Sequence, residues 1–160
     1  MSQTTQDVLI SARDLVSSGA LHRVAIPPPW RWSLGLQVLL VEDDRADAYL
    51  IRRALAKNTR VGEVILAEDG VEALEMCDNS RFVPDLAIVD LHMPRKDGLA
   101  LLRDFATRGR SKFPSVVLTS SRATKDALRA AKLGAAEFIT KPKTESELAA
   151  MLDRVIRKVV

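Results

Sequence analysis

The stretch that decides the fold is LAIVDLHMP, which runs from Leu86 to Pro94. Its first four residues are apolar, as in a strand that is buried on both faces, and Asp90 follows them directly. A buried charge is costly unless it is paired. Asp90 therefore predicts either a structural ion pair or a functional site at the end of this strand.

Strand-like and helix-like segments alternate along the chain around this stretch. Short apolar runs predict strands at 38–41, 61–67, 85–89, 115–118 and 136–139. Apolar residues at helical spacing predict helices at 46–57, 70–77, 99–107 and 124–133, and a last helix that begins after Thr144. This alternation predicts an α/β fold, with a parallel sheet that helices cover on both faces.

Polar residues end the other predicted strands as well. Glu42 and Asp43 follow the first strand, Thr119 ends the fourth and Lys141 follows the fifth. In open parallel sheets, ligands bind beyond the carboxyl ends of the strands. We therefore expect these side chains to meet Asp90 at one site.

The residue types at these strand ends are those of phosphoryl chemistry. Three carboxylates close together raise one another's pKa unless a cation lies among them, and an all-oxygen ligand set favours Mg²⁺. Lys141 adds a positive charge and Thr119 a hydroxyl, and an aspartate can accept a phosphoryl group covalently. Asp44, by contrast, is better explained as a helix N-cap or an exposed loop charge than as part of this site.

Composition limits the class of protein. The chain has 160 residues, of which 47% are hydrophobic and 28% charged, which is typical of one globular domain. The net charge of +3 comes from scattered Lys and Arg residues and does not favour direct nucleic-acid binding. Neither a secretory signal nor an apolar run of about 20 residues is present, so we expect a cytoplasmic protein without a membrane segment. Cys77 is expected to be a packed thiol on a helix.

Residues 1–36 do not follow the alternating pattern. They predict a short helix, then a stiff linker with the sequence PPP at 27–29, and they contain both tryptophans, Trp30 and Trp32. Two interpretations of this N-terminal extension stay open: it covers part of the domain surface, or it is an arm that binds a partner or a second copy.

Four motifs in order resemble a known family: VEDD at 41–44, VDLHMPRKDG at 89–98, LTS at 118–120 and KP at 141–142. Together they resemble the receiver domain of bacterial two-component response regulators, from about residue 37 to 160. The resemblance implies a flavodoxin-like, doubly wound sheet of order 2-1-3-4-5. The loop at 93–98 is also similar to that of single-domain regulators paired with bacterial phytochrome kinases.

The resemblance implies a role for each metal-site residue. Asp90 would be the phosphoacceptor and Asp43 a direct Mg²⁺ ligand. Glu42 would act on the metal largely through water. His92 would contribute its backbone carbonyl, which leaves its imidazole without a metal-binding role.

The resemblance also implies how the phosphorylated state is read out. Thr119 would be the switch hydroxyl that closes on the phosphoryl group, and Lys141 would pair with that group. Phe138 falls at the position of the switch aromatic, although a plain core role fits it equally well.

The resemblance thus implies a single-domain response regulator that accepts a phosphoryl group from a sensor histidine kinase or a phosphotransfer protein. Such a protein is not an enzyme in its own right, although it assists its own phosphorylation and dephosphorylation. A homodimer through the fourth helix, fifth strand and fifth helix is a further implied interface. The alternative is a degenerate receiver that binds partners without phosphorylation. A phosphatase of the haloacid-dehalogenase type is disfavoured, because it needs a second Asp where His92 stands.

Overall fold

The structure is a computed structural model that describes residues 35–78, 82–108 and 113–160. In this part of the chain, five parallel strands form one sheet of order β2-β1-β3-β4-β5. The strands are β1 (Leu36–Val41), β2 (Val61–Ala67), β3 (Leu86–Val89), β4 (Ser115–Thr119) and β5 (Glu137–Thr140). The α/β class and the strand order expected from the sequence are confirmed.

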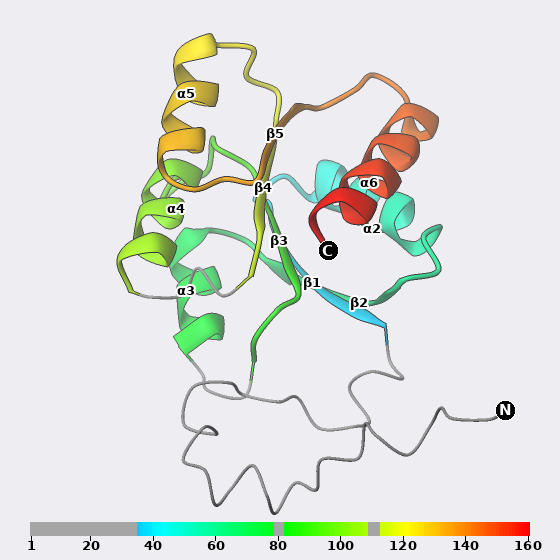
Figure 1. Cartoon of the computed structure of the whole chain (residues 1–160), viewed down its shortest axis with the longest axis horizontal. Coiled ribbons are helices and arrows are strands. Elements are labelled where there is room, and N and C mark those ends of the chain that lie inside the picture. Colours follow the sequence, from blue (N-terminus) through cyan, green and yellow to red (C-terminus); the bar gives the residue numbers. More distant parts are fainter. Residues whose placement is uncertain (1–34, 79–81, 109–112) are drawn as a thin grey trace, which may run out of the picture. The chain divides into compact units, whose positions relative to one another are not determined.

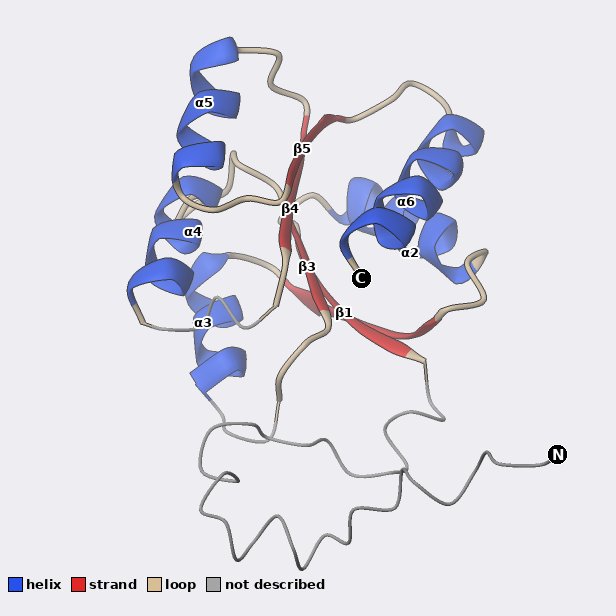
Figure 2. Ribbon diagram, viewed as in Figure 1, coloured by secondary structure: helices blue, strands red, loops and turns tan. Residues whose placement is uncertain are grey.

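Helices cover both faces of the sheet (Figures 1 and 2). One face carries α2 (Arg45–Ala56) and α6 (Glu145–Val159), which pack against each other, and the other carries α3 (Gly70–Asp78), α4 (Gly98–Thr107) and α5 (Thr124–Lys132). The winding direction therefore reverses between β1 and β3, which are neighbours in the sheet. This reversal is the switch point at which open α/β sheets bind ligands.

The alternation of side chains along each strand divides the core between the two faces. Val38 and Leu40 of β1 are buried with α2 and α6, whereas Leu39 and Val41 are buried with α3 and α4. Since β3 is buried over its whole length, its four apolar residues contact both halves of the core. Asp90 therefore follows a strand that is buried at every residue.

Side-chain caps set where the helices next to the site begin. Asp44 accepts a hydrogen bond from the backbone N–H of Asp47 at 2.8 Å, which confirms its expected role as the N-cap of α2. Asp97 caps α4 in the same way through the N–H of Ala100, also at 2.8 Å. The loops that leave β1 and β3 are consequently fixed where they enter α2 and α4.

Most of the predicted N-terminal extension, including Trp30 and Trp32, lies outside the described residues, and its role stays a prediction. The described chain enters β1 at Leu36, one residue before the predicted start of the domain. The Cys77 side chain is buried in α3, as expected. Among the described helices, none has the length and hydropathy of a membrane span.

Candidate functional site

Three acids meet at the carboxyl ends of β1 and β3. Glu42 follows β1 and Asp90 follows β3; both are buried, with 2% and 8% of their surface exposed, whereas Asp43 is exposed. Carboxylate oxygens of the three lie within 4.8 Å of one another. The strands hold them there, since the N–H of Asp90 donates to Val41 O and that of Glu42 to Ala67 O, each at 3.0 Å.

The acids differ in how many of their carboxylate oxygens already accept hydrogen bonds. Glu42 uses both oxygens: Oε1 accepts the N–H of Asp44 at 3.1 Å, and Oε2 accepts Lys141 Nζ at 2.6 Å. Asp90 Oδ1 accepts the N–H of Leu91 at 2.8 Å, which leaves Oδ2 facing the site. Among the described contacts, both oxygens of Glu42 therefore accept hydrogen bonds, whereas Asp90 keeps one oxygen that accepts none.

Lys141 lies opposite the acids at the end of β5. Its backbone N–H donates to Thr119 O at 2.8 Å, so β4 and β5 fix its position. Its Nζ lies 2.6 Å from Glu42, 2.7 Å from Asp47 and 3.9 Å from Asp90 Oδ2. The side chain is only 14% exposed, so solvent screens these contacts weakly.

Burial and charge act against each other at this site. Burial raises the pKa of Glu42 above its ordinary value, although the hydrogen bond from Lys141 opposes the shift. Burial alone would lower the pKa of Lys141, but hydrogen bonds to Asp47 and Glu42 outweigh it and raise the pKa. The lysine is therefore charged at neutral pH; three acids, Glu42, Asp47 and Asp90, lie within 3.9 Å of its ammonium group, and Asp43 adds a fourth carboxylate to the acid cluster. The excess negative charge favours a divalent cation.

The ligand set of the acid cluster fits Mg²⁺. Its donors are carboxylate oxygens, which this hard ion prefers, and the exposed position of Asp43 leaves room for water and phosphate oxygens. The set contains neither thiolate nor imidazole groups, which would favour softer metals.

The predicted switch residues lie on the other side of Asp90. Thr119 ends β4, is fully buried, and accepts the N–H of Ser121 on Oγ1 at 3.3 Å. Phe138 of β5 is half-buried and packs against a cluster that includes Val117 and Ala130. The structure brings Thr119 and Phe138 to neighbouring strands, and their switch roles stay predictions.

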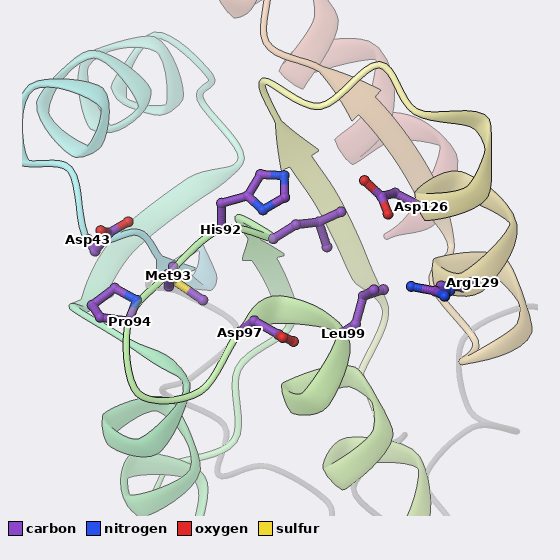
Figure 3. A pocket seen from close by; sticks show the side chains of 9 residues that line it. Asp43, His92, Met93, Pro94, Asp97, Leu99, Asp126 and Arg129 are labelled. Atoms are coloured by element: carbon purple, nitrogen blue, oxygen red, sulfur yellow. The ribbon is translucent and has the colours of Figure 1, made fainter.

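An open groove runs from the acids to α5 (Figure 3). Asp43 and His92 come from the β1 and β3 ends, whereas Asp126 and Arg129 come from α5. The groove is lined by Asp43, Leu91, His92, Met93, Pro94, Asp97, Leu99, Asp126 and Arg129. Of the three clustered acids, Asp43 lines this groove, and the exposed His92 ring lies along it.

Two ion pairs anchor the loop between β3 and α4. Arg95, which has a positive φ of 62°, pairs with the buried Asp69 at the start of α3. Lys96 pairs with Asp104 of α4 at 2.6 Å. The loop that follows Asp90 is therefore tied to both neighbouring helices.

Asp69 makes the stability of the fold depend on pH. Burial alone would raise its pKa, but the N–H groups of Glu72 and Val71 and the Arg95 guanidinium outweigh burial and lower it. Because the folded pKa lies below the unfolded value, Asp69 stabilises the fold above the unfolded value of about 4. That contribution is lost as the pH falls through the folded pKa.

Asp69→Asn is therefore expected to lower stability by about 1–2 kcal/mol at pH 7, because the charged acceptor of two N–H groups is lost. It should also flatten the decline of the unfolding free energy below about pH 4. Urea unfolding between pH 7 and pH 2 measures both effects. Arg95→Met measures how much of this stability comes from the ion pair with Arg95. If the unfolding free energies of wild type and Asp69→Asn decline equally steeply below about pH 4, the lowered pKa of Asp69 is wrong.

Comparison with known proteins places this site in a family. Residues 38–153 match the family described as the response regulator receiver domain. The chain belongs to this family. It is also 36% identical over 123 residues to the response regulator MprA of Mycobacterium sp. (strain KMS), a match that covers 77% of this chain and 51% of MprA. The chain thus spans about half the length of the curated relatives that it matches.

This chain covers a larger share of two solved receiver structures than it does of MprA. The phosphorylated cyanobacterial phytochrome response regulator RcpA is 30% identical, with a TM-score of 0.72, and the match covers 78% of this chain and 94% of RcpA. The Mn²⁺-bound form of response regulator Rcp1 is 28% identical, with a TM-score of 0.68, and the match covers 75% and 91% of the two chains. The recognition made from the four motifs is therefore confirmed, and this chain is a receiver domain of two-component signalling.

Two contacts near the receiver site were not predicted from the sequence. Asp47 binds Lys141, and Ser121 Oγ donates to the buried Asp126 at 2.7 Å. A signal for the first did exist: side chains in the first turn of a helix lean back toward its N-terminus, which here follows β1 directly. The second gave no comparable signal, because Ser121 and Asp126 are ordinary loop and helix residues in type.

Proposed function

We propose that this receiver accepts a phosphoryl group on Asp90 from the phosphohistidine of a sensor histidine kinase or a phosphotransfer protein, with Mg²⁺ bound. The observation that carries the proposal is the set of Glu42, Asp43 and Asp90 oxygens within 4.8 Å of one another, with Lys141 opposite. The likeness to RcpA, a phytochrome response regulator, supports a phytochrome-type kinase as the donor.

The reaction moves the phosphoryl group from nitrogen to oxygen. A carboxylate oxygen of Asp90 attacks phosphorus, the phosphorus–nitrogen bond of the donor breaks, and the imidazole keeps the electron pair. The product is an acyl phosphate on Asp90 and, because the departing imidazole takes up one proton from solvent, a neutral histidine on the donor. This chain supplies position and charge, as phosphoryl transfer generally requires.

Each residue of the site has a task in this scheme. Bound through Asp43, Asp90 and the backbone carbonyl of His92, Mg²⁺ would neutralise charge on the transferred group. Glu42 would support the metal through water, because both its oxygens carry hydrogen bonds already. Lys141 would donate to a phosphoryl oxygen, since its ammonium is within 3.9 Å of the acceptor carboxylate.

The new charge would act as a switch. A phosphoryl group adds about −1.5 to −2 charge and three acceptor oxygens. The Thr119 hydroxyl would leave Ser121 to bind one of them and draw in the loop before α5. Phe138 would respond on β5, so the surface of α5, β5 and α6 would change toward a partner or a second copy of the chain.

The protein would act as a phosphoacceptor and not as a turnover enzyme, and its place would be the cytoplasm, where kinases have ATP. Incubation of the full chain with a small acyl-phosphate donor tests the proposal. Intact-mass measurement should find one added phosphoryl group when Mg²⁺ is present and almost none when EDTA removes it. A protein that gains no mass under either condition would favour the phosphorylation-independent alternative.

A further inference from the structure

Asp47 shares Lys141 with the acid cluster. Its Oδ2 lies 2.7 Å from Lys141 Nζ, nearly as close as Glu42 at 2.6 Å and much closer than Asp90 at 3.9 Å. Asp47 is 39% exposed and comes from the first turn of α2, outside the acid cluster of β1 and β3. The ammonium group is therefore held on the α2 side of the site, away from the acceptor carboxylate.

The Asp47 carboxylate has no other structural task that the described contacts reveal. Its backbone N–H serves the N-cap of α2, by donating to Asp44, and this bond does not involve the side chain. The Asp47 side chain donates nothing and accepts only from Lys141 among the described residues. A change from carboxylate to amide can therefore test the Lys141 contact while leaving the cap in place.

A negative group on Asp90 would compete with Asp47 for the lysine. The hydrogen bonds to Glu42 and Asp47 hold the ammonium 3.9 Å from Asp90 Oδ2, beyond hydrogen-bond distance, so a group on Asp90 must draw it away from Asp47. The Asp47 carboxylate also repels any new negative charge placed near Lys141. Both effects favour the form in which Asp90 carries no phosphoryl group.

We infer that Asp47 is a positioning residue that holds Lys141 in the resting arrangement and thereby opposes the phosphorylated one. The inference rests on the proposed function, because it assigns Lys141 to the phosphoryl group. It predicts that loss of the Asp47 charge makes a phosphoryl analogue bind more tightly.

The test measures the affinity of the full chain for beryllofluoride at saturating Mg²⁺, by titration calorimetry, in wild type and two variants. Asp47→Asn should bind about fivefold more tightly, the upper end for a partly exposed charge pair. Glu68→Gln is the matched control: it removes one exposed acid that follows β2 and pairs only loosely, at 4.0 Å, with Arg45. Its affinity should equal that of wild type.

A second readout needs no metal. In EDTA, a double-mutant cycle of Asp47→Asn and Lys141→Met on urea unfolding should give a coupling of at least about twofold in the unfolding equilibrium constant. If Lys141→Met does not fold, Lys141→Arg takes its place in the cycle. Because arginine keeps the positive charge, the coupling should then be smaller than with Lys141→Met but still different from zero.

The outcomes separate the inference from the proposed function. If wild type binds beryllofluoride and Asp47→Asn binds equally or more weakly, the inference is wrong and the proposed function stands. Zero coupling in EDTA would also overturn it, because the contact itself would be absent. If wild type neither binds beryllofluoride nor accepts a phosphoryl group, both are overturned together.

Discussion

Asp90→Asn is expected to abolish phosphoryl incorporation from a small acyl-phosphate donor. An amide cannot serve as the oxygen nucleophile, so the added mass seen in wild type should fall below detection. The fold should survive, because the asparagine oxygen can still accept the N–H of Leu91 that Asp90 Oδ1 accepts at 2.8 Å. The Asp90 charge also raises the pKa of Glu42 by repulsion, so its removal should leave stability equal or slightly higher.

Asp97→Asn is the matched control for this variant. Asp97 lies seven residues further along the same loop and lines the groove, but it is not part of the acid cluster. Asparagine is an equally good N-cap, so α4 should keep its first turn. Asp97→Asn should be phosphorylated like wild type, and a phosphoryl group that persists in Asp90→Asn would show that another residue is the acceptor.

Gly98→Ala is expected to cost about 2–4 kcal/mol of stability and to impair phosphorylation. Gly98 opens α4 directly beneath the acceptor, where its N–H donates to Leu91 O at 3.0 Å. A Cβ at this position would overlap the carbonyl oxygen of Asp90 and come within 2.9 Å of Leu91 Cα. Because both neighbours are backbone atoms, no side-chain rotation can relieve the overlap, and the acceptor must move.

Gly134→Ala separates this overlap from the general effect of adding a side chain to glycine. Gly134 has a φ of +88°, and an added Cβ would meet nothing within 4 Å. Alanine there should cost about 1 kcal/mol through backbone strain alone and leave phosphorylation unchanged. Urea unfolding and intact-mass measurement together compare the two variants. A Gly98→Ala protein as stable as Gly134→Ala would contradict the predicted clash.

The sequence was enough to predict the sheet and the positions of its polar ends. The apolar run at 86–89 ends on Asp90 because a parallel strand that is buried on both faces must be apolar until it leaves the sheet. The same rule placed Glu42 and Lys141 at the ends of β1 and β5. The strand order came from the family resemblance and not from the pattern, since alternation alone does not define it.

The contacts that tune the site were not predicted from the sequence, although the position of Asp47 in the first turn of α2 was a partial signal for one of them. Asp47 and Lys141 are 94 positions apart, and their contact depends on the rotamer of each side chain. Arg95, which has a positive φ, and Asp69 are 26 positions apart and meet across the loop and the start of α3. Such pairs join residue types that usually lie on solvated surfaces, so residue type alone does not identify the partner.

The most direct test of Asp90 as the acceptor is a crystal structure of the protein with Mg²⁺ and beryllofluoride. We expect beryllium bonded to an Asp90 carboxylate oxygen, a metal ligated by Asp43 and Asp90, and fluorine contacts from Thr119 and Lys141. Beryllofluoride attached to another residue, or absent from a crystal that contains the metal, would contradict it.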